Sequence, residues 1–390
     1  MRERRACASA VRGASRGGRT AALGCLAIAL LCCAQTLDAQ RLRLTLLDSA
    51  GRAPMGGAIV TVLRADDARH VEAIIGPSGA RVLPINAIGT YRVRVRRVGY
   101  RPFVSPPIRV MSTADVALEL RLPETRIPLP TVLAAVRGRC DVGGAYDTHA
   151  ADVLETAKTS LIAASVAWRD QFDPLDVWLV SRRYSLSGRV LDSVRVARPA
   201  RTEEPFESDS AEVLHRDGYV HTDTLTGDRV YFLPSVETMI SDAFLDTHCF
   251  AVVDDRRDSS RVGLRFEPLH HQQQPDVRGT MWLERTHRAL SLIEFAFQQV
   301  TYPAATRGAT GRVRIRTLPS GVRFVDEWHI RMPLFGVVWS GATAGNRVRQ
   351  VGWKEDGGAA RVRLTGRGAD TIPLAGVRRG PVAISTWGYH

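Results

Sequence analysis

The stretch Gly89-Thr90-Tyr91-Arg92-Val93-Arg94-Val95-Arg96-Arg97-Val98-Gly99-Tyr100 decides the fold of the first part of the chain. Within it, Tyr91, Val93 and Val95 alternate strictly with arginines, so one side of the segment is apolar and the other is charged. Alternation with a period of two predicts a β-strand that is buried on one face only. Because glycines bound the segment and Pro102 follows it, the strand is expected to end near Gly99.

Shorter apolar segments surround this strand at intervals that are typical of a small β-sandwich. Turn sequences separate them, among them Asp48-Ser49-Ala50-Gly51 and Gly76-Pro77-Ser78-Gly79. About seven strands in roughly eighty residues, with a turn every eight to twelve residues, is the pattern of such a sandwich. We therefore expect residues 40–122 to form a seven-stranded β-sandwich.

The order of these elements resembles that of the carboxypeptidase regulatory-like domain, which has a transthyretin-like or carbohydrate-binding-like fold. The residues that carry the resemblance are Asp48–Gly51, Ala58–Leu63, Gly76–Gly79 and Gly89–Tyr100. The resemblance covers about a fifth of the chain. It implies a docking or stabilising module without catalytic residues, because the regulatory domain of that family has none.

The first 39 residues have the features of a secretory signal. Six arginines precede an apolar run from Ala21 to Ala34, and small residues around Ala39 suit cleavage there. Cleavage before Cys25, with lipidation of that cysteine, is the alternative. No later stretch is long and apolar enough for a transmembrane helix. We expect an exported protein, located in the periplasm or associated peripherally with the outer membrane.

The chain carries a formal net charge of +13, almost all of it from arginine, since Lys158 and Lys354 are its only lysines. Such a charge is typical of nucleic-acid binding, but export and the spread of the arginines over strands argue against that function. A cell-envelope protein, a lipid or a phosphorylated glycan is the expected partner.

Only Cys140 and Cys249 remain after the expected signal. In an oxidising compartment, a lone pair of cysteines is most simply a disulfide. The alternative is an unrecognised hydrolase, in which Cys249, His248 and Asp246 would supply a thiol nucleophile, a base and an acid. Neighbours along a strand point to opposite faces, which argues against that use of His248 and Cys249.

A proline-rich segment, residues 123–131, is the expected linker to a second domain at 140–365, and residues 366–390 are an expected loose tail. The second domain has one clear amphipathic helix, Ala150 to Trp168, with an apolar face at three- and four-residue spacing. A long antiparallel meander of strands follows it. We expect a mainly β protein, the sandwich being followed by an antiparallel meander or half-barrel with one packed α-helix.

No motif of a zinc peptidase, an NTPase or a dinucleotide-binding fold occurs in the chain, so we expect neither a cofactor nor a metal. His215, Asp217, His221 and Asp223 lie close together and are residue types that metals bind. A solvated hairpin around Gly218 and Tyr219 accounts for them better.

Strands around Gly279–Glu284 and Leu290–Phe295 resemble the lipid-cradling half-barrels of periplasmic lipoprotein carriers. That resemblance implies an apolar ligand or a partner on the concave face of the sheet, with Trp282, Phe295 and Trp328 as contacts. The sequence thus predicts a non-catalytic cell-envelope protein. A glycan-binding module is an alternative, which rests on the fold of the sandwich alone.

Overall fold

The computed structural model describes residues 40–362 except for 51–52, 86, 112–114, 124–126, 128, 130–147, 171–174, 200–207, 223–228, 270–273, 299–307, 319–320 and 340–345. The expected signal, Cys140 and the expected tail therefore lie outside the described residues. The protein is mainly β, with antiparallel sheets and a few helices, as predicted. None of the described helices is long and apolar enough to cross a membrane.

The described part of residues 40–122 contains eight strands in two sheets, one strand more than predicted. The smaller sheet has the order β4-β1-β8, in which β1 pairs antiparallel with β4 and parallel with β8. The larger sheet has the order β3-β2-β5-β6, with β7 also paired to β5. The strands are β1 Gln40–Asp48, β2 Ile59–Arg64, β3 Arg69–Ile74, β4 Ala80–Ile85, β5 Gly89–Arg96, β6 Phe103–Val104, β7 Ile108–Val110 and β8 Val116–Leu122.

The alternating strand is β5, and its burial follows the sequence pattern. Tyr91, Val93 and Val95 are buried in the core of this domain, whereas the arginines between them are only partly buried. The core also takes leucines from β1 and valines from β2, so both sheets contribute to it. Burial of this apolar face on folding is the main force that holds the two sheets together.

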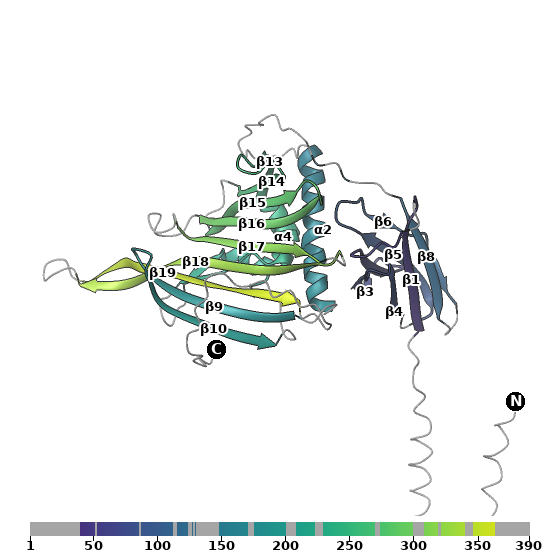
Figure 1. Cartoon of the computed structure of the whole chain (residues 1–390), viewed down its shortest axis with the longest axis horizontal. Coiled ribbons are helices and arrows are strands. Elements are labelled where there is room, and N and C mark those ends of the chain that lie inside the picture. The colour runs from purple at the N-terminus through teal and green to yellow at the C-terminus, as the bar shows by residue number, and fades with distance from the viewer. Residues whose placement is uncertain are drawn as a thin grey trace, which may run out of the picture.

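The second domain is built on one antiparallel sheet with the order β10-β9-β19-β18-β17-β16-β15-β14-β13 (Figure 1). Its strands are β9 Leu175–Ser185, β10 Val190–Pro199, β13 His248–Asp254, β14 Arg261–Pro268, β15 Asp276–Glu284, β16 Ala289–Gln298, β17 Thr310–Thr317, β18 Arg323–Trp339 and β19 Asn346–Val362. β18 and β19 extend past the other strands at the end away from the long helix (Figure 1).

The long helix, α2, runs from Thr148 to Asp170 and packs against one face of this sheet. The predicted apolar face is confirmed, since Val153, Ala157, Leu161 and Ala164 are all buried in the core of the domain. One polar contact fixes the helix to the sheet. The buried Ser160 hydroxyl accepts a hydrogen bond of 3.2 Å from the backbone N–H of Leu290 at the start of β16.

Smaller elements lie between β10 and β13: α3 Ala211–Asp217, β11 Val220–Thr222, β12 Arg229–Tyr231, α4 Val236–Ile240 and α5 Asp242–Thr247. The prediction of a hairpin around Gly218 and Tyr219 is wrong, because Gly218 ends the helix α3. Ser210 caps that helix by accepting from the N–H of Val213. Helices this short leave little periodic signal in a sequence, which explains why they were not predicted.

A second side of α2 packs against the N-terminal sandwich. Ala163, Val166 and Ala167 form a small buried cluster with Ile59 and Ile74, which come from β2 and β3. Two ion pairs flank this cluster, Arg169 with Glu72 at 3.5 Å and Arg101 with Asp152 at 3.6 Å. The two domains therefore share α2 as a common packing element (Figure 1).

Candidate functional site

The concave face of the sheet, where sequence analysis expected an apolar ligand, is occupied by the protein itself. Phe295 is 4% exposed and Trp328 is 3% exposed, and both belong to the core that α2 covers. Each ring packs against a glycine of a neighbouring strand: Phe295 against Gly311, and Trp328 against Gly358. These two aromatics are core residues in this structure.

Trp282 does not join them, because it lies on the opposite face of the sheet. Its neighbours along β15, Met281 and Leu283, are buried on the α2 side, whereas Trp282 is only partly buried. Its indole N–H donates to Glu294 Oε2 at 3.0 Å, and the Arg261 guanidinium lies 5.5 Å from the ring centroid. The expectation that the three aromatics share one face is thus wrong for Trp282.

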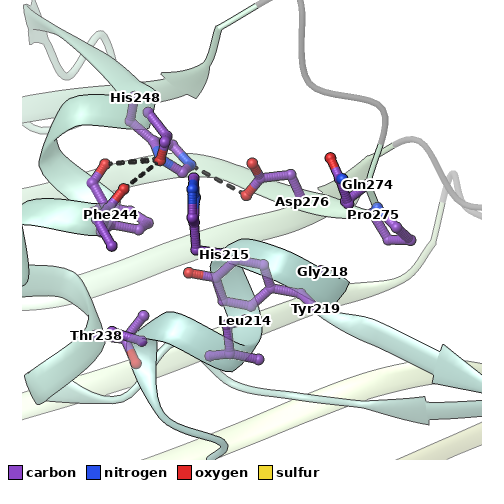
Figure 2. A pocket seen from close by; sticks show the side chains of 13 residues that line it. Leu214, His215, Gly218, Tyr219, Thr238, Phe244, His248, Gln274, Pro275 and Asp276 are labelled. Atoms are coloured by element: carbon purple, nitrogen blue, oxygen red, sulfur yellow. Dashed lines mark hydrogen bonds and ion pairs between the residues drawn. The ribbon is translucent and has the colours of Figure 1, made fainter.

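A small hollow beneath α5 surrounds His248, which is 4% exposed (Figure 2). On one side, Nδ1 lies 3.0 Å from the carbonyl oxygen of Phe244. On the other, Nε2 lies 3.1 Å from the carbonyl oxygen of Val277 and 3.3 Å from Asp276 Oδ1. The imidazole also stacks on the Phe244 ring with 3.9 Å between centroids. Both nitrogens are engaged by the fold, so neither is left to act on a substrate.

The hollow itself has a volume of about 10 Å³, room for a single water molecule. Tyr219 lines it, and burial together with the negative charge of Asp276 raises the pKa of the Tyr219 phenol well above its ordinary value. The phenol therefore stays neutral. Such a site fixes α5 to the sheet and has no space for a substrate.

The residues of the hydrolase alternative do not come together. Asp246 is exposed on α5, and the carboxylate beside His248 is that of Asp276 instead. His248 and Phe250 are buried on one side of β13, so Cys249, between them, faces the other side. Sequence analysis missed Asp276 because it lies 28 positions after His248, beyond the reach of any local motif.

The other cluster of metal-ligand types also has internal partners. The Arg216 guanidinium pairs with Asp217 at 2.6 Å, and His221 Nε2 lies 2.8 Å from the carbonyl oxygen of Gly218. His215 is exposed on α3, and Asp223 lies outside the described residues. Within the described ranges, no three His, Cys, Asp or Glu side chains are grouped so as to hold a metal ion.

An open groove of about 910 Å³ lies on the outer face of the sheet, on the side from which Arg312, Arg314 and Arg316 project. We call it the outer groove. It runs over β14 to β18, and its floor includes Ser291 and Leu292 of β16. Arg312, Arg314 and Arg316 line it, projecting from β17 on the side away from the buried Val313 and Ile315.

Acidic side chains hold part of this arginine row in place. Arg314 pairs with Asp326 at 2.9 Å and with Glu327 at 2.6 Å, and Arg316 pairs with Asp326 at 3.1 Å. The hydrogen bond to Asp326 raises the pKa of Arg314 above its ordinary value. Asp326 is only 6% exposed and accepts from both guanidiniums, so a single buried carboxylate holds the two arginines beside each other.

Arg312 differs from its two neighbours in the row. It is exposed, and in the strand register it lies between Glu294 on β16 and His329 on β18. Burial lowers the pKa of His329, and the positive charge of Arg312 adds to that lowering. Arg312 therefore presents its charge to the groove beside a neutral imidazole.

The lining of the groove also includes Arg323, a buried arginine. Its guanidinium donates to the carbonyl oxygen of Leu290 at 2.8 Å. Burial lowers the pKa of Arg323 to about 10, which still leaves the group charged at neutral pH. The lining of the outer groove also includes hydroxyl groups, the aliphatic residues Leu292, Ile315 and Leu318, and the acids Asp258 and Glu284. Arginines outnumber the acids in this lining, a set suited to a polar molecule that carries an anionic group.

Comparison with known proteins adds no identity. No family model and no curated protein matches the chain. It is weakly similar to the TIE protein of Bacillus anthracis, with 10% sequence identity over 80% of this chain and 48% of that chain and a TM-score of 0.20. It is also weakly similar to a 9R-lipoxygenase from Cyanothece, with 11% identity over 70% of this chain and 41% of that chain and a TM-score of 0.17. A putative membrane-associated protein of unknown function from Bacteroides fragilis matches at 10% identity, over 83% of this chain and 98% of that chain, with a TM-score of 0.16.

The chain spans less than half the length of the first two of these structures. At such TM-scores the likenesses do not identify its fold.

Proposed function

We propose that this is an exported, non-catalytic cell-envelope protein whose second domain binds a partner or a polar ligand in the outer groove. In this proposal residues 40–122 are a module of the carboxypeptidase regulatory-like kind, which docks or stabilises the second domain. The shared packing of α2 against both domains supports the stabilising role.

One observation carries the proposal: the concave face is filled, and the outer groove is open. An apolar ligand would have to displace α2 and the aromatic core, at a cost that its own burial could not offset. The outer groove is already formed and needs no such rearrangement, and its volume of about 910 Å³ suits a ligand or a segment of a partner.

The arginine row favours an anionic group. Guanidiniums bind phosphate through two parallel hydrogen bonds, and Arg314 and Arg316 are already held in place by Asp326. Arg312 contributes the exposed charge. A phosphorylated glycan of the cell envelope fits this chemistry. The glycan would then bind to the second domain and not to the sandwich, where sequence alone suggested it.

The experiment is a calorimetric titration of the exported chain with two forms of one probe, a phosphorylated lipopolysaccharide core oligosaccharide and the same molecule after dephosphorylation. We expect the phosphorylated form to bind more tightly. Arg312→Glu should weaken that binding by about tenfold or more, as expected for loss of a charge-assisted contact. Arg109→Glu, an equal charge change on the exposed part of β7, should leave it unchanged. Equal binding of both forms would contradict anionic recognition.

We also propose that the chain is exported and that Cys140 and Cys249 form a disulfide. Cleavage after Ala39 would make Gln40 the first residue, which is where β1 begins. The Cys140–Cys249 disulfide would tie the segment before α2 to β13. A native mass spectrum without reductant tests both, since it reports the mass of the processed chain and the absence of two hydrogens. A free thiol would reopen the question of Cys249 as a nucleophile.

A further inference from the structure

The distal end of the sheet exposes aliphatic side chains that folded proteins normally bury. Leu186 is 60% exposed, Val190 and Leu191 are each 54% exposed, and Val351 is 43% exposed. They lie together, because β9 pairs with β10 on one side and with β19 on the other. We call these four residues the distal apolar patch. Exposed apolar groups gathered in this way mark an interaction surface.

Positive charges surround this patch. Exposed arginines lie on β9 (Arg183), on the turn between β9 and β10 (Arg189) and on β19 (Arg349). Asp192 on β10 is an exposed acid near them. Aliphatic side chains flanked by arginines are the pattern of protein surfaces that enter the headgroup region of a membrane. The long aliphatic part of each arginine can lie along the apolar layer while its guanidinium binds phosphate.

We propose that the distal apolar patch inserts into the surface of a bilayer with anionic phospholipid headgroups. Its position fits this role, because β18 and β19 project at this end of the sheet, away from α2 and the N-terminal sandwich (Figure 1). The proposal concerns a different surface from the outer groove.

A second copy of the chain is the rival occupant, since β10 is the outermost strand of the sheet. Strand-to-strand pairing of two copies would need a regular edge. The register of β10 shifts between Val190 and Asp192, so the edge is irregular at the patch itself. Irregularities of this kind protect edge strands from pairing.

The test is flotation of the exported chain with two kinds of vesicle, one of phosphatidylglycerol mixed with phosphatidylcholine and one of phosphatidylcholine alone. We expect flotation with the anionic vesicles and less of it at high salt. The double variant Leu186→Asp/Leu191→Asp should lower the partition coefficient by about tenfold or more, since it removes the two leucines that would enter the membrane. The double variant Arg189→Glu/Arg349→Glu should lower flotation with the anionic vesicles and leave flotation with phosphatidylcholine vesicles unchanged.

The matched control is Ile88→Asp/Met111→Asp, which changes two aliphatic residues of the sandwich that are 61% and 81% exposed. It should float like the unaltered chain. Absence of flotation, or equal flotation of the control and the patch variants, would overturn the proposal. Sedimentation as a dimer that Leu186→Asp/Leu191→Asp converts to a monomer, without vesicle binding, would assign the patch to a second copy instead. The patch variants should still bind the oligosaccharide probe, so failure of one proposal is distinguishable from failure of the other.

Discussion

Replacing Phe295 by alanine tests whether the aromatics of the concave face are core residues or ligand contacts. The ring is 4% exposed, packs on Gly311 and meets Phe297 edge-on with 5.7 Å between centroids. Truncating such a ring loses its transfer free energy and leaves a cavity, so we expect a loss of about 3–5 kcal/mol in the free energy of unfolding.

The contact with Gly311 gives this prediction a specific signature. A methyl group at position 311 would overlap the Phe295 ring, so Gly311→Ala alone should cost about 1–3 kcal/mol through overpacking. In Phe295→Ala the overlapping ring is absent, and the added methyl group would partly fill the cavity. The double variant should therefore be no less stable than Phe295→Ala, and the two changes should not be additive.

Urea unfolding followed by circular dichroism measures these free energies, and Trp282→Ala is the control. Trp282 is partly exposed on the opposite face and makes one hydrogen bond to Glu294, so its truncation should cost about 0.5–1.5 kcal/mol. If Phe295→Ala costs no more than Trp282→Ala, or if the two changes at 295 and 311 add, the assignment of Phe295 to the core is refuted.

Two further outcomes follow from buried polar groups. Asp276→Ala removes the carboxylate beside the buried His248 and should lower the free energy of unfolding by about 3–5 kcal/mol in the same urea assay. The control Asp246→Ala, on the exposed side of α5, should change that free energy by less than about 0.5 kcal/mol. Similar effects of the two substitutions would contradict the pairing of Asp276 with His248. Burial lowers the pKa of His329 below its ordinary value of 6.5, so the unfolded chain binds the proton first and stability should fall as pH drops from above 6.5 towards the lowered value. His329→Gln should reduce this slope, and an unchanged slope would show that His329 does not contribute to it.

The fold of the protein could be predicted where burial follows a simple period. β5 and α2 are such elements, since Val93 and Val95 alternate with arginines and the apolar residues of α2 recur every three or four positions. Short helices such as α3 escaped prediction because a few residues do not complete a periodic pattern.

The strand β19 is an element whose length could not be predicted from local sequence pattern. It is one strand from Asn346 to Val362, although the apolar pattern of the sequence predicts two strands, Arg347–Trp353 and Ala360–Leu364. The polar residues and glycines between them continue the strand because β19 pairs with β18 on one side and with β9 on the other. Gly357 and Gly358 leave room for residues of β18, and Asp356 accepts from Ser181 of β9 at 2.6 Å. Such tertiary contacts override local propensity and cannot be read from one segment.

The candidate site was predicted neither in its residue types nor in its location. The aromatics Phe295 and Trp328 attracted attention because they are large and apolar, and those same properties place them in the core. The arginines of β17 looked like an ordinary solvated face. Their role as the wall of a groove depends on the neighbouring strands β16 and β18, which come together with β17 only in the folded sheet.

The position of α2 between the two domains has a mechanical consequence. Because the same helix is buried against the sheet and against β2 and β3, the sandwich cannot rotate about the proline-rich linker without exposing Ala163, Val166 and Ala167. A force on the sandwich would therefore reach the sheet, and its projecting β18–β19 end, through α2.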